Sequence, residues 1–171
     1  MIDLKTKIRE VADFPTPGVG FKDITPLLAD KRALQETIAG LAGWAKQKNP
    51  DVILGAEARG FILGAAIAAA SGCGFVPARR PGKLPPETVS ASYVLEYGEN
   101  ALELHPDLIP NGARVVIHDD VLATGGTVEA ICGLVEGLGG VVVGACFIIE
   151  LTFLGGREKL KDLDVHALIA Y

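Results

Sequence analysis

Short apolar runs alternate with helical patterns along most of the chain. The predicted strands are Val52–Leu54, Phe75–Val76, Val115–Ile117, Val141–Ile149 and Val165–Ile169. Predicted helices cover residues 59–71, 127–138 and 157–163. Strands that are apolar almost throughout are buried on both faces, and their alternation with helices is typical of parallel sheets. The pattern predicts an α/β fold with a mostly parallel, twisted sheet flanked by helices.

The N-terminal part follows a different pattern. An apolar stripe at helical spacing opens the chain: Leu4, Ile8 and Val11. It predicts a short helix that ends before Pro15. Residues 13–28 hold three prolines and two glycines, so we expect no regular structure there. Asp30 can cap the next helix, whose stripe consists of Leu34, Ile38, Leu41 and Ala45.

Two further segments lie between the second and third predicted strands. Arg79–Glu87 is a basic loop rich in glycine and proline. A β-hairpin is predicted after it, with arms at Ser92–Leu95 and Ala101–Leu104 and a turn around Gly98 and Asn100.

Composition and charge narrow the range of functions. A chain of 171 residues is predicted to form one domain. Its net charge of −5 argues against broad nucleic-acid binding but permits a focused site for an anionic substrate. Three widely spaced cysteines favour a reducing, cytoplasmic compartment. The longest uncharged stretch, Gly60–Ala78, is interrupted by glycine and proline, so we interpret it as a buried helix and strand rather than a membrane span.

The most informative segment is Val115–Thr127, with the sequence VVIHDDVLATGGT. A buried strand ends in two carboxylates, and a loop of small residues then opens a helix. Free N–H groups at a helix start bind anions, and carboxylates accept hydrogen bonds from vicinal hydroxyls. The segment therefore indicates a site for a ribose that carries a phosphate. A polar turn with a threonine cap is the alternative interpretation.

This segment resembles the phosphoribosyl pyrophosphate (PRPP) signature of type I phosphoribosyltransferases. The resemblance extends along nearly the whole chain and is specific to adenine phosphoribosyltransferases. The matching segments are Phe14–Pro15, Pro17–Val19, Phe21, Asp23–Pro26, Arg59–Phe61, Gly82–Pro85, Ala91–Tyr93 and Leu95–Gly98. It implies that Asp119 and Asp120 hold the ribose hydroxyls of PRPP. It places the 5'-phosphate on the loop residues Ala123, Thr124, Gly125, Gly126 and Thr127.

The resemblance assigns a second loop to pyrophosphate. The loop contains Glu57, Ala58 and Arg59, and the family suggests a cis peptide bond between Glu57 and Ala58. Arg79 and Lys83 are implied to bind pyrophosphate as well, and in this family such residues can reach the neighbouring subunit, so we expect a homodimer. The residues alone leave open an ordinary turn and a solvated basic loop.

For the base, the resemblance implies that Phe21 stacks on adenine and that Val121 forms the opposite wall. The backbone of Val19 and Gly20 would read the edge of the ring. An N–H group facing N1 and a carbonyl facing the 6-amino group would reject 6-oxopurines, because these reverse both donor and acceptor. Lys22 stands where many relatives carry arginine. A core position for Phe21 is the alternative.

Glu96 and Tyr97 match the mobile flap of the family. The resemblance implies that Glu96 exchanges a proton at purine N7 while the bond at N9 forms, which keeps the ring near neutral. Glu96 as one exposed hairpin carboxylate among several is the alternative.

The whole resemblance implies one domain with a base-binding hood (residues 1–28) and a flexible flap (residues 79–105). It implies conversion of adenine and PRPP into AMP and pyrophosphate, without a nucleic-acid or membrane partner. Mg²⁺ would be bound mainly through PRPP, pyrophosphate and water, with no metal site built by the protein itself. The alternatives are a phosphoribosyltransferase for another purine such as xanthine, and a non-catalytic regulator that senses PRPP.

Overall fold

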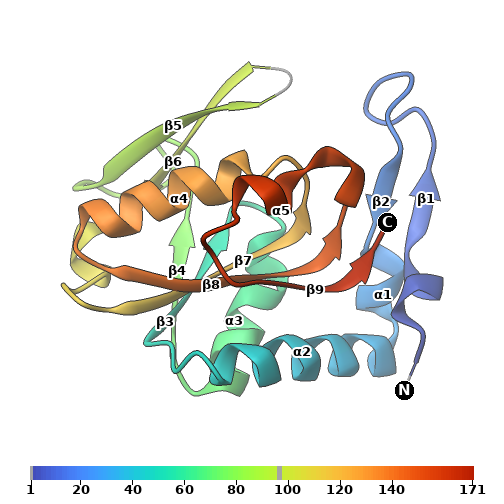
Figure 1. Ribbon diagram of the computed structural model, residues 1–171, viewed down its shortest axis with the longest axis horizontal. Coiled ribbons are helices and arrows are strands. Elements are labelled where there is room, and N and C mark those ends of the chain that lie inside the picture. Colours follow the sequence, from blue (N-terminus) through green and yellow to red (C-terminus); the bar gives the residue numbers. More distant parts are fainter. Residues whose placement is uncertain (1, 96–97) are drawn as a thin grey trace.

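The computed structural model describes residues 2–95 and 98–171, and for residues 93–95 and 98–100 it describes the backbone only. Within these residues, five strands form a parallel sheet in the order β4-β3-β7-β8-β9 (Figure 1). The strands are β3 (Val52–Ala56), β4 (Gly74–Ala78), β7 (Arg114–Leu122), β8 (Val141–Glu150) and β9 (Val165–Ala170). The predicted α/β fold with a mostly parallel sheet is confirmed.

Helices cover both faces of this sheet. Helices α2 (Lys31–Lys46) and α3 (Gly60–Ser71) lie on one face and α4 (Gly126–Gly137) on the other (Figure 1). Each face has its own apolar core, which holds Leu41 and Ile67 on the first face and Ile131 on the second. Shorter helical segments are η1 (Leu4–Lys7), α1 (Thr25–Ala29), η2 (Pro106–Leu108), η3 (Thr152–Leu154) and α5 (Gly156–Lys159).

Asp30 caps α2 as predicted. Its Oδ1 atom accepts hydrogen bonds from the N–H groups of Arg32 (3.0 Å) and Ala33 (3.1 Å). Its second oxygen lies 2.7 Å from Lys7 Nζ. The Lys7 contact and the helix N–H groups together lower the pKa of Asp30 to about 2. The cap therefore ties the helix start to the N-terminal segment.

The N-terminal prediction is wrong in part. The first helical segment ends at Lys7, and the following residues form β1 (Arg9–Val11), which pairs antiparallel with β2 (Phe21–Asp23). A helix this short is marginal in water, so pairing with β2 prevails. Residues 13–28 also hold the start of α1, where Pro26 lies in the first turn and its missing N–H costs no hydrogen bond.

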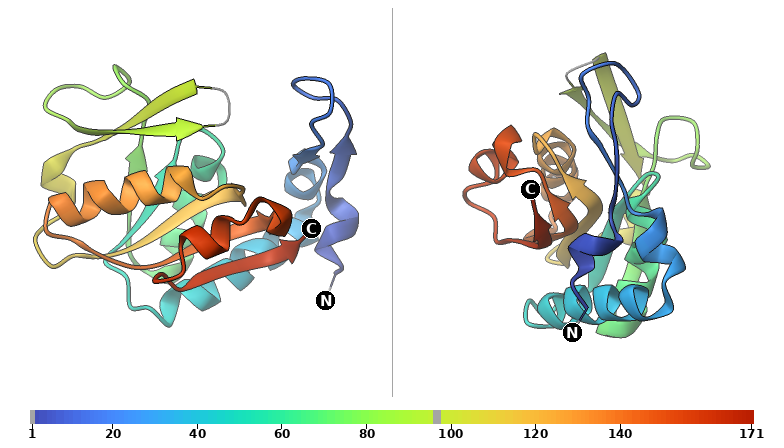
Figure 2. Two further views of the ribbon diagram at one scale, coloured as in Figure 1. Left: turned by 45° about the horizontal axis from the view of Figure 1, so that its top comes forward. Right: turned by 90° about the vertical axis from the view of Figure 1, so that its right-hand side faces the viewer.

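The central hairpin is confirmed, but its predicted turn is wrong. Strands β5 (Val89–Leu95) and β6 (Gly98–Leu104) pair antiparallel, with Leu95 opposite Gly98 and Tyr93 opposite Asn100. Gly98 and Asn100 are therefore strand positions, because the backbone pairing extends past them. The hairpin is fixed at its base, where the Arg79 N–H donates to the Glu103 carbonyl (2.9 Å). The left view of Figure 2 shows the hairpin of β5 and β6 at a different end of the molecule from β1 and β2.

The last helix is also shorter than predicted. The pattern over 157–163 predicted seven helical residues, and α5 ends at Lys159. Leu163 closes a turn on Leu160 (N–H to carbonyl, 2.9 Å), and Asp164 then accepts a hydrogen bond from Ala145 in β8 (2.9 Å). The chain leaves the helix early because it must enter β9 beside β8.

Candidate active site

Two adjacent carboxylates, Asp119 and Asp120, lie in the carboxyl half of the central strand β7. The predicted strand bounds, Val115–Ile117, are too short, because the strand continues through both acids to Leu122. Backbone pairing with β8 continues from Asp119 opposite Phe147 to Leu122 opposite Glu150, although the apolar run has stopped. The sheet therefore fixes the backbone of both acids.

Burial and mutual proximity control the charge of this pair. Asp120 is 2% exposed, and its Oδ2 atom lies 3.0 Å from Arg59 Nε. Burial and the neighbouring Asp120 carboxylate raise the pKa of Asp119. Burial also raises the pKa of Asp120, and the Arg59 guanidinium opposes this rise. The Asp120 Oδ2 atom accepts no hydrogen bond of good geometry from the described residues. A ligand with hydroxyl donors matches this unsatisfied acceptor.

The loop Ala123–Thr127 leads from β7 into α4. Gly125 has φ +83° and forms the N-cap of the helix. Left-handed backbone of this kind favours glycine. The N–H groups of the first helical turn have no partner within the helix, so they can bind an anion. Thr124 and Thr127 are half-buried beside them. The helix start lies where the sequence places it, and the anion site there stays a prediction.

The loop rests on the chain that enters α5. A Cβ atom built on Gly156 would lie 2.2 Å from the Ala123 carbonyl oxygen. A Cβ atom on Gly125 would lie 3.0 Å from the Gly156 carbonyl oxygen. Sequence reasoning missed this contact between two backbones. The adjacent glycines 155 and 156 were its signal in the sequence.

The second loop follows β3 and contains the cis peptide bond predicted between Glu57 and Ala58. Glu57 Oε2 accepts hydrogen bonds from Arg79 Nε (3.0 Å) and the Arg80 N–H (3.0 Å). Burial acts to raise the pKa of Glu57, but these two contacts outweigh it and lower the pKa. Arg79 also donates from Nη1 to the carbonyl of Lys83 (3.1 Å). The basic loop therefore lies against the second loop.

Phe21 lies at the edge of an apolar cavity of about 500 Å³. Its ring packs edge-to-face on Phe14, with 5.1 Å between the centroids. Arg59 and Ile62 also line the cavity. The guanidinium carbon of Arg59 lies 5.0 Å from the centroid of the Phe21 ring. The core alternative for Phe21 does not hold, because this half-buried ring faces a cavity.

The other residues predicted around the base take separate positions. The Val19 carbonyl accepts a hydrogen bond from the Phe14 N–H (3.1 Å). Gly20 is exposed, with open space where a Cβ atom would lie. Val121 is half-buried in β7 and packs against the core that holds α2 and α3. Lys22 forms an ion pair with Glu10, and its Nζ atom lies over the Tyr171 ring. The structure thus brings Phe21 to Arg59, and Val121 lies outside the cavity.

Arg59 joins the two halves of the site. Its guanidinium contacts both the Phe21 ring and the buried Asp120 carboxylate. The sequence prediction placed Arg59 at pyrophosphate and did not include a contact with Asp120. The contact with Asp120 depends on β3 lying next to β7, where Gly55 pairs with His118. Strand order in a sheet does not follow from the order of apolar runs, so this contact could not be predicted.

Glu96 and Tyr97 lie outside the described residues. Across the part of the chain that is described, no group of three or more His, Cys, Asp or Glu side chains could hold a metal ion. In that same part, no helix is both long enough and apolar enough to cross a membrane.

Comparisons with known proteins agree with this geometry. The family model for the phosphoribosyl transferase domain matches residues 27–167. An adenine phosphoribosyltransferase of Clostridium perfringens is 54% identical over 170 residues, which cover 99% of this chain and 99% of that protein. The crystal structure of adenine phosphoribosyltransferase from Thermoanaerobacter pseudethanolicus superposes with a TM-score of 0.95 at 51% identity, covering 99% and 98% of the two chains.

A third relative was solved with ligands. The adenine phosphoribosyltransferase of Saccharomyces cerevisiae, complexed with an imino-altritol bisphosphate and adenine, has a TM-score of 0.88 at 38% identity. The match covers 95% of this chain and 94% of that one. This chain therefore belongs to the adenine phosphoribosyltransferases, within the type I phosphoribosyltransferase family.

Proposed function

We propose that the carboxyl edge of the sheet binds PRPP and adenine side by side, with Arg59 at their junction. As a member of its family, the chain carries out purine salvage: it converts adenine and PRPP into AMP and pyrophosphate. The bond from N9 to the anomeric carbon forms, and the bond from that carbon to pyrophosphate oxygen breaks. The observation that carries the proposal is the position of the Arg59 guanidinium, in contact with both Phe21 and Asp120.

Asp119 and Asp120 hold the ribose hydroxyls in this proposal. Asp120 Oδ2 is buried beside Arg59 Nε but accepts no hydrogen bond of good geometry from the described residues, and a ribose hydroxyl can supply one. The 5'-phosphate lies on the N–H groups of Gly125, Gly126 and Thr127, with hydroxyl donors from Thr124 and Thr127. Ala123 completes the loop. Its small side chain leaves the backbone accessible to phosphate oxygens.

Pyrophosphate occupies the second loop, at Glu57, Ala58 and Arg59. Ala58 is exposed, and the loop lies at the carboxyl end of β3, next to the acids of β7. Arg79 is held by hydrogen bonds to Glu57 and to the Lys83 carbonyl. We therefore propose that it shapes this loop and attracts pyrophosphate by its positive charge. The exposed Lys83 is free to approach the pyrophosphate of a second subunit, which makes a homodimer part of the proposal.

Adenine stacks on Phe21, beside Arg59. The exposed backbone at Gly20 offers its N–H and carbonyl to the edge of the base. Val121 does not line this cavity, so as an opposite wall it would contact only a base that extends from the cavity toward β7. Val19 helps to shape the turn that presents Gly20. The adenine held by the yeast relative supports a base site in this fold.

The remaining parts follow the family pattern. We assign residues 1–28 to a base-binding hood and residues 79–105 to a flap within one domain. The flap carries Tyr97 and Glu96. Glu96 exchanges a proton at N7 of adenine, and the flap closes the site to water. A magnesium ion would be held mainly by PRPP, pyrophosphate and water, and it would neutralise charge on the pyrophosphate.

We also propose that the enzyme acts in the cytoplasm. Cys73, Cys132 and Cys146 are free thiols, which suits a reducing compartment. Burial raises the pKa of Cys146 to about 12, so this thiol is inert near neutral pH.

A panel of bases tests the function. Purified protein is incubated with PRPP and Mg²⁺, and with adenine, hypoxanthine, guanine or xanthine in parallel. We expect nucleotide formation with adenine only. Turnover with a 6-oxopurine would support the proposed PRPP site and refute the proposed base contacts. PRPP binding without turnover of any base would favour the regulator.

A further inference from the structure

The hairpin that carries Phe21 is too small to fix its own position. Strands β1 and β2 have three residues each, and isolated two-stranded hairpins are marginally stable in water. Residues 12–20 connect them, and all of these except Val19 are exposed. The position of Phe21 relative to the sheet therefore depends on contacts outside the hairpin.

One of these contacts starts at Lys22, the residue after Phe21. Neighbouring strand residues point to opposite faces, so Lys22 lies on the face away from the Phe21 ring. Lys22 is paired with Glu10 of β1, and its side chain is only 14% exposed. Its Nζ atom lies 3.9 Å from the centroid of the Tyr171 ring. Lys5 Nζ lies 4.2 Å from the same centroid. Two ammonium groups therefore meet one aromatic ring.

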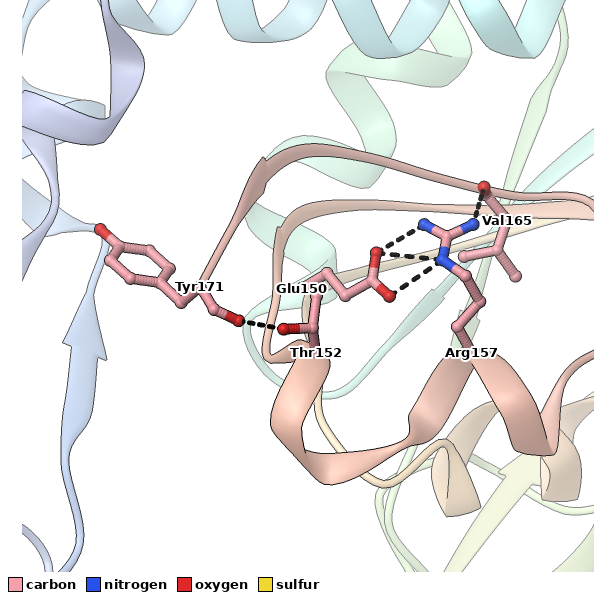
Figure 3. A network of polar contacts seen from close by, with 5 residues as sticks. All are labelled: Glu150, Thr152, Arg157, Val165 and Tyr171. Atoms are coloured by element: carbon pink, nitrogen blue, oxygen red, sulfur yellow. Dashed lines mark hydrogen bonds and ion pairs between the residues drawn. The ribbon is translucent and has the colours of Figure 1, made fainter.

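The backbone of Tyr171 is anchored to the carboxyl edge of the sheet. Its N–H donates to the Glu150 carbonyl (2.9 Å). Its carbonyl accepts from the Thr152 N–H (2.9 Å) and hydroxyl (2.6 Å). Figure 3 shows the ring extending away from these contacts toward the N-terminal segment. Glu150 is itself held by Arg157, whose Nε lies 2.9 Å from Oε1.

We infer that Tyr171 is a positioning residue for adenine: its ring holds Lys22 and thereby holds Phe21 over the base site. The inference rests on the proposed function, because it requires Phe21 to stack on adenine. A cation–π contact acts through the face of the ring, so phenylalanine can replace tyrosine here. The PRPP loop lies on β7 and α4 and does not depend on this contact.

Steady-state kinetics of Tyr171→Ala test the inference. We expect KM for adenine to rise roughly tenfold, which corresponds to about 1.4 kcal/mol and to a partly desolvated cation–π contact. We expect KM for PRPP to stay within about twofold of the wild-type value. General destabilisation of the fold would not raise one constant and spare the other. Tyr171→Phe should restore the wild-type constants. Phe153→Ala, which removes an aromatic ring that is 72% exposed in the neighbouring turn, is the matched control and should change neither constant.

Lys22→Met provides a second route if Tyr171→Ala does not fold. It removes the charge of the side chain and keeps its apolar part. It should raise KM for adenine and leave KM for PRPP unchanged. In the double variant the two effects should be less than additive, because both single variants lose the Lys22–Tyr171 contact. Equal rises in both constants, an unchanged KM for adenine, or additive effects would overturn the inference. Wild-type protein that forms no AMP would instead refute the proposed function.

Discussion

His118 is the buried titratable residue closest to the acidic pair in sequence. Its side chain is fully buried, and Nδ1 lies 3.0 Å from the Cys146 carbonyl. Burial lowers the pKa of His118 to about 4, although the Cys146 contact acts in the opposite direction. The imidazole is therefore neutral at physiological pH. It lies in β7 at the centre of the sheet.

This residue predicts an acid-sensitive fold. The unfolded chain binds a proton at His118 near its ordinary pKa of 6.5, and the folded chain does so only near 4. The unfolded state therefore gains protons first, and stability present above pH 6.5 is lost as the pH falls toward 4. His118→Gln keeps a donor for Cys146 and does not titrate. We expect it to remove up to about 3 kcal/mol of the pH dependence of the unfolding free energy. Denaturant unfolding between pH 7 and pH 4 measures this, and identical pH slopes in both proteins would refute it.

At the scale of elements, the start of α4 is supported by the start of α5. The backbone of Gly156 fits against Ala123 with no room for a methyl group. The Arg157 guanidinium fixes this turn, since Nη1 donates to the Val165 carbonyl (2.7 Å) (Figure 3). The phosphate loop thus takes its shape from a segment about thirty residues later in the chain.

Gly156→Ala should therefore displace the phosphate loop. We expect KM for PRPP to rise roughly tenfold or more, because the backbone N–H donors are misplaced. KM for adenine should change less. Gly133→Ala is the matched control, because Gly133 lies on the exposed face of α4 with open space around it. It should raise the midpoint of thermal unfolding and leave both KM values unchanged. A Gly156→Ala enzyme with wild-type KM for PRPP would contradict the role of this contact.

The helices and strands also show which parts of the fold could be predicted from the sequence. Apolar strands such as Val141–Glu150 were predictable because burial on both faces leaves a continuous apolar run. The cap at Asp30 was predictable because it is local chemistry. Strand β1 was not, since its three residues owe their conformation to pairing with β2. The hairpin turn was misplaced because Gly98 and Asn100 are common turn residues that here pair in register.

On the scale of the whole molecule, the sheet order brings the site together. Placing β3 beside β7 puts the loop of Arg59 against Asp120, and the N-terminal hairpin then adds Phe21 (Figure 1). The acidic pair and the loop proposed to bind phosphate could be located in the sequence because they form one continuous motif. The contacts of Arg59, Gly156 and Tyr171 were not, because each joins segments that only the fold brings together.

The most direct test of the account compares wild-type protein with an Asp119→Asn and Asp120→Asn double variant. Both receive adenine, PRPP and Mg²⁺, and AMP and pyrophosphate are quantified together. We predict equal amounts of the two products from the wild type. We predict a loss of roughly 100-fold or more in kcat/KM in the variant, equivalent to about 2.7 kcal/mol of lost transition-state stabilisation. The midpoint of thermal unfolding should change little in the variant, because the relief of two buried acids is offset by the loss of the Arg59–Asp120 ion pair. Undiminished AMP formation by a folded variant would contradict a reaction at this edge of the sheet.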